Sequence, residues 1–117
     1  MAQEDKPLRA AEAALDNEHC PVALTARLIG DPYILMILRD LANGTLRFGS
    51  LSDSVSVNPR TLTARLRRME QDGLVVRHMF AEIPPRVEYT LTDKGHALLP
   101  VVEALRAYGD AWLVAPV

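Results

Sequence analysis

Residues 58–73 carry both the start and the end signals of one helix, and this helix constrains the rest of the fold. Asn58 is a good N-cap, because its side-chain oxygen can accept a hydrogen bond from a free backbone N–H. Pro59 follows at the first helical position, where its missing N–H costs nothing. Gly73 can adopt the left-handed conformation that ends a helix. Apolar side chains at a spacing of i, i+4, i+7 predict one buried face. They are Leu62, Leu66 and Met69.

The opposite face of this helix is basic and narrow. At about 100° per residue it holds a set of polar and small side chains, flanked by two threonines near its start. Arginine can donate hydrogen bonds to a guanine edge or to a phosphate, and a hydroxyl can donate or accept a hydrogen bond at a base. A small residue lets the helix approach the DNA surface closely. This composition is what a helix in the major groove of DNA needs, although an ordinary solvated face is also charged. The residues are Arg60, Ala64, Arg67, Arg68 and Gln71, with Thr61 and Thr63 beside them.

The segments on either side predict a helix-turn-helix followed by a wing. Residues 50–55 read as a short helix and turn directly into the long one, which is the order of that motif. After it, residues 74–80 and 86–91 read as two strands of a β-hairpin. The loop between them holds two consecutive prolines, which cannot pair in a ladder. We expect Arg77 and Arg86 at the base of this wing, where they suit phosphate or minor-groove contact, with Glu88 holding one of them in place.

The two ends of the chain predict dimerisation helices. Residues 1–19 are alanine-rich and helical in pattern, but such a short helix is marginal alone and needs a surface to dock on. Thr92 is expected to cap a last helix that runs to about Leu113, with Pro100 either kinking it or marking its real start. Its long apolar face exceeds what one small domain can cover, which favours a second subunit. We therefore expect a helical extension at 1–19, a DNA-binding domain at 20–92 and a dimerisation helix at 93–117.

Composition excludes several classes of protein. The 117 residues include only one cysteine, so no disulfide forms within the chain, which fits a reducing cytoplasm. No apolar run approaches the roughly 18 residues of a membrane span, and the N-terminus lacks the pattern of a signal peptide. The net charge is −2, yet residues 41–80 carry 6 basic and 3 acidic side chains. A local basic segment can bind phosphate within an acidic chain, because screening makes nearby charge dominate.

The order of these motifs resembles the HxlR-type winged helix-turn-helix regulators over about residues 20–112. The resemblance is carried by Cys20-Pro21-Val22, Leu28-Ile29-Gly30, Ile37-Leu38-Arg39-Asp40-Leu41 and Arg47-Phe48-Gly49-Ser50-Leu51. It continues through Pro59-Arg60-Thr61-Leu62-Thr63-Ala64-Arg65-Leu66, Leu74-Val75, Pro84-Pro85-Arg86-Val87-Glu88-Tyr89 and Leu91-Thr92-Asp93-Lys94-Gly95. The chain departs from the family in one place. Family members have a pattern similar to Gly-Gly-Lys-Trp where this sequence has Gly30-Asp31-Pro32-Tyr33. The departure removes a possible phosphate contact by the lysine.

The resemblance implies a mainly α fold with a small β-hairpin, namely a winged helix-turn-helix domain with N- and C-terminal dimerisation helices. It implies a homodimeric prokaryotic transcriptional regulator on a palindromic operator of double-stranded DNA. Its DNA-binding positions fall on Asn58, Arg60, Thr61, Thr63 and Arg67 of the long helix, and on Arg86 of the wing. The sequence itself adds Ala64 and Arg68. The operator, the direction of regulation and any small-molecule effector are not readable from the chain.

Cys20 is a candidate redox sensor by resemblance to some family members. A thiol at a helix N-terminus has its thiolate stabilised by the helix dipole. The alternative is a small, buried, unreactive side chain.

The three histidines have no partners at ligand spacing, so we expect no metal and no cofactor. No nucleophile with a base, phosphate loop or carboxylate pair indicates an enzyme. A winged-helix module that binds protein and not DNA stays open as the alternative function.

Overall fold

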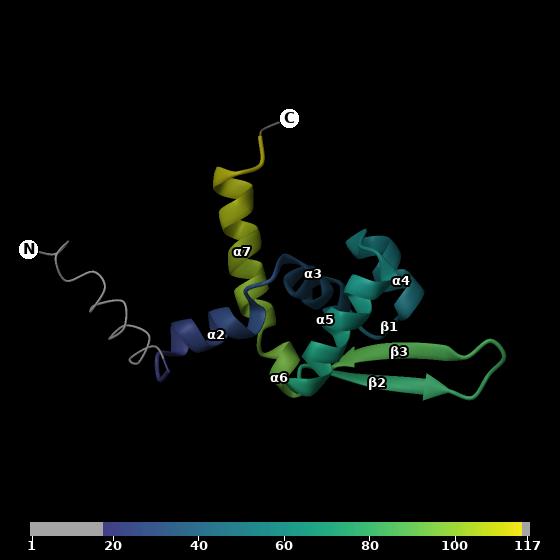
Figure 1. Cartoon of the computed structure of the whole chain (residues 1–117). Coiled ribbons are helices and arrows are strands. Elements are labelled where there is room, and N and C mark those ends of the chain that lie inside the picture. The colour runs from purple at the N-terminus through teal and green to yellow at the C-terminus, as the bar shows by residue number, and fades with distance from the viewer. Residues whose placement is uncertain (1–17, 116–117) are drawn as a thin grey trace, which may run out of the picture. The chain divides into compact units, whose positions relative to one another are not determined.

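The computed structural model describes residues 18–115 (Figure 1). The chain divides into two compact units between Gly30 and Asp31. In the first unit the described part holds one helix, α2 (Pro21–Ile29), whose N-cap is Cys20. The helix predicted within residues 1–19 lies almost wholly outside the described residues and stays a prediction. No single helix in the described part is long and apolar enough to cross a membrane.

The second unit contains a helix-turn-helix and a small sheet, in the order that the sequence predicts. Its helices surround one apolar core, and the two long strands leave that core as a hairpin (Figure 1). The elements are α3 (Pro32–Leu41), β1 (Leu46–Arg47), α4 (Phe48–Val55), α5 (Pro59–Gln71), β2 (Val75–Phe80), β3 (Arg86–Leu91), α6 (Asp93–His96) and α7 (Leu99–Trp112).

Helix α3 is the centre of this core. Asp31 caps it, because its Oδ1 accepts hydrogen bonds from the N–H groups of Tyr33 at 2.8 Å and Ile34 at 3.3 Å. The helix packs against α4, α5 and α7. The side chains that fill the space between these helices are almost fully buried. They include Ile34, Ile37, Leu38 and Leu41 of α3, Leu51 of α4, and Leu62, Leu66 and Met69 of α5.

The sheet has three antiparallel strands in the order β1-β3-β2. The central strand pairs on one side with β1, where Leu46 lies opposite Tyr89, and on the other with β2. The expected hairpin is confirmed, and the short extended segment before α4 joins it as a third strand. The helix predicted at 50–55 begins earlier, at Phe48, directly after β1.

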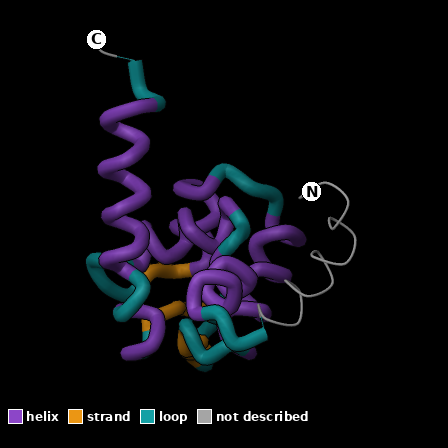
Figure 2. Tube along the Cα trace, turned by 90° about the vertical axis from the view of Figure 1, so that its left-hand side faces the viewer, coloured by secondary structure: helices purple, strands orange, loops and turns teal. Residues whose placement is uncertain are grey.

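The prediction of one continuous last helix from Thr92 was wrong. Thr92 caps only the four-residue α6, by accepting from Gly95 N–H at 3.1 Å, and two non-helical residues separate it from α7. The break follows from Pro100, which has no N–H to bond the preceding turn. Pro100 therefore marks the real start of the long helix, which was one of the two expectations. Figure 2 shows α7 as a regular, uninterrupted helix.

Candidate nucleic-acid interface

The start of α5 is built as the sequence predicts. The Asn58 side chain accepts a hydrogen bond from Thr61 N–H at 2.8 Å, and Pro59 holds the first helical position. At the other end Gly73 has a φ of 75°, a conformation that glycine adopts freely. The turn from α4 passes through Ser56, whose φ of 57° is also left-handed. These caps fix where α5 begins and how it leaves the turn.

The basic face of α5 points outward. Leu62, Leu66 and Met69 are buried on the opposite side, as expected from their spacing. The side chains proposed to meet DNA divide into two exposure classes. Asn58, Arg60, Ala64, Arg67 and Arg68 are exposed, whereas Thr61 and Thr63 are half-buried at the edge of the face.

The arginines of α5 differ in what they contact. Arg65 points to the core side and donates from Nε to Asp31 Oδ2 at 2.7 Å. Arg68 lies 3.9 Å from Asp72, one turn further along the helix. For Arg60 and Arg67, no carboxylate of residues 18–115 lies within ion-pairing distance. These two residues are seven apart, so they share one face about 10 Å from each other along the axis, with Ala64 between them.

Arg77 and Arg86 occupy different parts of the wing. In the register of the hairpin Arg77 lies opposite Tyr89, near the middle, and Arg86 lies opposite Phe80, beside the loop. The expectation that both stand at the base of the wing is therefore wrong for Arg86, because β3 starts at this residue. Arg77 pairs with Glu70 of α5 at 3.7 Å, which ties the wing to the end of that helix.

Arg86 is held inside the wing. Its Nη2 lies 3.3 Å from Glu82, its Nε lies 3.2 Å from Glu88, and its guanidinium stacks over the ring of Phe80 at 4.0 Å. The Nε is buried and its geometry toward Glu88 does not satisfy a hydrogen bond. Glu88 thus holds Arg86, as one of the two expected pairings had it, while Arg77 takes Glu70 as its partner.

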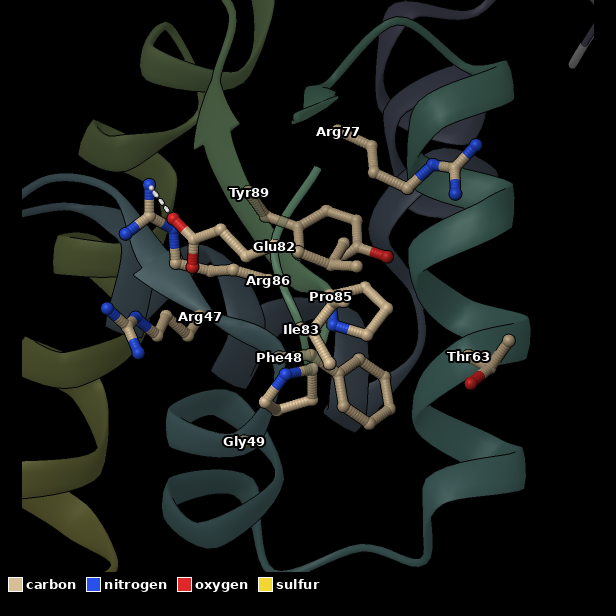
Figure 3. Close-up of a pocket in the computed structure, with 12 residues that line it drawn as sticks. Arg47, Phe48, Gly49, Thr63, Arg77, Glu82, Ile83, Pro85, Arg86 and Tyr89 are labelled. Atoms are coloured by element: carbon tan, nitrogen blue, oxygen red, sulfur yellow. Dashed lines mark ion pairs between the residues drawn. The ribbon is translucent and has the colours of Figure 1, made fainter. Parts of the chain in front are cut away.

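A hollow of about 590 Å³ separates α5 from the wing. Figure 3 shows Thr63 and Arg77 on its α5 side, with Phe48 and the loop residues Ile83 and Pro85 across from them. Arg47 lies at its rim and extends away from α5 (Figure 3). The lining also includes Arg86 and its partner Glu82. Arginines, a hydroxyl and apolar walls suit a sugar–phosphate strand, whose contacts are mostly with such groups. Sequence reasoning missed Arg47 and Phe48 as part of this surface, since only the pairing of β1 with β3 brings them to the wing.

Tyr89 closes the floor of the hollow with only 7% of its surface exposed. Tyr89 therefore belongs to the apolar core. Burial raises the pKa of its hydroxyl, with Glu70 adding to the rise and Arg77 and Arg67 opposing it. The hydroxyl therefore stays protonated at neutral pH and can donate a hydrogen bond. It points toward α5 (Figure 3).

Cys20 is half-buried at the N-cap of α2. It is the chain's only cysteine. The described part of the chain holds no group of three or more His, Cys, Asp or Glu side chains placed to bind a metal ion.

Comparison with known proteins agrees with this architecture. The model of the HxlR-like helix-turn-helix family matches residues 28–116. An uncharacterized HTH-type transcriptional regulator of Synechocystis sp. is 37% identical over 105 residues, which are 88% of this chain and 78% of that protein. A putative MarR-family regulator of Porphyromonas gingivalis superposes with a TM-score of 0.79 at 28% identity, over 82% of this chain and 95% of that one.

A third likeness concerns redox control. The structure of the redox regulator HypR in its reduced form superposes with a TM-score of 0.73 at 34% identity, over 78% of this chain and 91% of that one. The family match covers most of the chain and includes the turn, α5 and the wing described above. This chain belongs to the HxlR-like helix-turn-helix family of transcriptional regulators.

Proposed function

We propose that this chain is a sequence-specific DNA-binding regulator that works in the cytoplasm as a homodimer on a palindromic operator. The observation that carries the proposal is the stripe of Arg60, Ala64 and Arg67 on α5. Its two guanidinium groups are exposed and have no carboxylate partner in the described part of the chain. An arginine left without an acid keeps its five N–H donors for a guanine edge or a phosphate.

Each residue of the α5 surface has a proposed role. Arg60 and Arg67 read bases in the major groove, and Ala64 allows the helix to approach them closely. Asn58 and Thr61 lie at the N-terminal end of the helix, the part that contacts base edges in this type of motif. Thr63 faces the hollow, where the backbone of one strand would lie, and Arg68 contacts phosphate.

Arg86 has an indirect role in the proposed contact with DNA. A direct phosphate contact would have to displace Glu82 or Glu88 from its guanidinium. We therefore propose that Arg86 fixes the loop of the wing beside the DNA and does not itself neutralise a phosphate.

The proposed dimer rests on α7. Buried Leu98 and Val102 continue along this helix into exposed apolar side chains on the same side. An apolar stripe of this length on a small domain marks an association surface, and a two-fold pair would match a palindromic operator. The exposed residues are Val101, Leu105, Tyr108 and Trp112, the last with 76% of its surface accessible.

We propose in addition that Cys20 makes the regulator responsive to oxidants. Two facts support this: its half-buried thiol is accessible in part, and the chain is similar to a protein described as a redox regulator. With one cysteine in the chain, the thiol would form a disulfide with a second copy or with a small thiol such as glutathione.

Selection of bound duplexes from a random pool tests the proposed function. We expect enrichment of a two-fold symmetric sequence whose half-sites lie about one helical turn, roughly 34 Å, apart. The matched control is the double variant R60A/R67A, which should enrich no sequence while it unfolds at the wild-type temperature. Failure of the wild-type protein to enrich any sequence would favour the protein-interaction alternative.

A further inference from the structure

The loop of the wing has no cation to offer to DNA. We call residues 81–85, between β2 and β3, the wing loop. They include one acid, Glu82, two prolines and no basic residue. A wing that binds phosphate electrostatically needs lysine or arginine at this place. A contact of this loop with DNA would therefore need a chemistry other than a salt bridge to phosphate, and the inference rests on the proposed function.

The nearest cation is already engaged. Arg86 has only 26% of its side chain exposed and lies against Glu82, Glu88 and the ring of Phe80. Releasing it would separate Glu82 from this arginine, would leave Glu88 with Arg47 alone at 4.0 Å, and would break a ring contact. Arg86 thus neutralises Glu82 and anchors the wing loop, so that the loop presents little net charge.

What the loop presents is one apolar side chain. Ile83 has 102% relative exposure, the highest among the large apolar residues of the described chain. Pro84 and Pro85 follow it, and their rings fix φ and restrict the motion of the backbone behind it. A single exposed apolar residue needs no explanation on its own. This one also lines the hollow that α5 and Arg77 face.

We propose that Ile83 is an apolar wedge for the minor groove next to the major groove that α5 occupies. The hollow would take the intervening sugar–phosphate strand, with Thr63 and Arg77 on one side and the wing loop on the other. Apolar wedges partly unstack a base step and favour sequences that deform easily, such as pyrimidine–purine steps. The wing thereby selects flexible flanking sequence, and α5 reads the half-site.

The proposed preference for flexible flanking sequence is tested by measuring the affinity for operators whose flanking sequences differ. The selected operator is made with a TA step, or with a stiff A-tract, at the flanking position that footprinting assigns to the wing. We expect the wild-type dimer to prefer the TA flank by about 5-fold or more, within the range of a single base-pair effect. Ile83→Ala should lose this preference. Met79→Ala, which shortens another exposed apolar side chain of the same hairpin, should retain it.

A second variant tests, by adding a positive charge, whether the wing loop lies close to a DNA phosphate. Ile83→Arg should steepen the dependence of log K on log salt by about 0.9, because one more phosphate is neutralised. Ile83→Ala should leave that slope unchanged. If wild-type protein binds no duplex specifically, the proposed function fails and this inference with it. If it binds specifically while Ile83→Ala keeps the flank preference, or Ile83→Arg leaves the slope unchanged, only the wedge is refuted.

Discussion

The Asp31 carboxylate joins two helices. Its Oδ1 caps α3, and its Oδ2 accepts from Arg65 Nε at 2.7 Å, so the first turn of the core helix is fixed to the middle of α5. Arg65 also lies over the ring of Tyr33, at 5.9 Å. In the sequence, Asp31 is only one of the residues at which the chain departs from the Gly-Gly-Lys-Trp pattern of the family. In the structure the same residue orients the helix proposed to read DNA.

This contact predicts a pH-dependent stability. Burial by itself raises the pKa of Asp31, but the hydrogen bonds from Arg65, Ile34 and Tyr33 outweigh it and bring the pKa below 3.8. The folded state thus favours the ionised form. The stability that this provides is complete above pH 3.8 and is lost as the pH falls through the lower, folded-state value.

Replacing the Asp31 carboxylate should reveal how much its ionised form contributes to the free energy of unfolding. Asp31→Asn keeps a capping oxygen but removes the charge, and we expect a loss of about 1–3 kcal/mol in the free energy of unfolding at pH 7. The gap to wild type should shrink as the pH is lowered toward 2. Glu103→Gln, which removes an exposed carboxylate from α7, is the control and should change little. Equal stability of Asp31→Asn and wild type at pH 7 would show that the contact contributes nothing.

The arginines of α5 should separate into base readers and phosphate binders. Arg67→Ala and Arg60→Ala are each expected to cost about 1–3 kcal/mol on the selected operator and less on a scrambled duplex. Arg68→Ala should weaken both duplexes alike and reduce the salt slope by about 0.9. Arg106→Ala on α7 removes a comparable exposed charge and should leave specificity intact. Titrations at several salt concentrations distinguish these results.

The features encoded locally could be predicted from the sequence. Asn58 and Gly73 bound α5, the apolar spacing gave its buried face, and two prolines marked the wing loop, because each signal lies within a few residues of its effect. Pairings across the chain could not be predicted. Arg47 meets Glu88, and Arg77 meets Glu70, only once the sheet and α5 are assembled. The break before α7 was foreseen as one of two effects of Pro100, and the sequence alone did not decide between them.

The apolar stripe of α7 predicts a dimer that one charge can disrupt. Leu105→Glu places a carboxylate in the middle of the stripe, where burial against a second copy would leave it unpaired. We expect the variant to sediment as a monomer at concentrations where wild type is a dimer, and to lose operator affinity. Ala107→Glu, on the exposed opposite side of the same helix, should stay dimeric. A wild-type protein that sediments as a monomer would remove the basis of the proposed symmetry.

Oxidation should act through Cys20 alone. Its thiolate attacks the disulfide of oxidised glutathione, a new S–S bond forms at Cys20, and one glutathione leaves as the thiol. We expect the modified protein to bind its operator less tightly and to recover after treatment with dithiothreitol. Cys20→Ser should be insensitive to the same treatment. If mass spectrometry shows Cys20 fully modified while operator binding stays constant, the thiol has no regulatory role. The same holds if Cys20 stays unmodified after the treatment and operator binding does not change.

We propose above all that α5 lies in the major groove with Arg67 on a guanine. Methylation interference tests it most directly, because a methyl group on guanine N7 blocks the acceptor that an arginine uses in that groove. With wild-type protein we predict interference at symmetric guanines about one helical turn apart, and with Arg67→Ala the loss of interference at one guanine in each half-site. Interference that is absent from both half-sites, or unchanged by Arg67→Ala, would contradict this account.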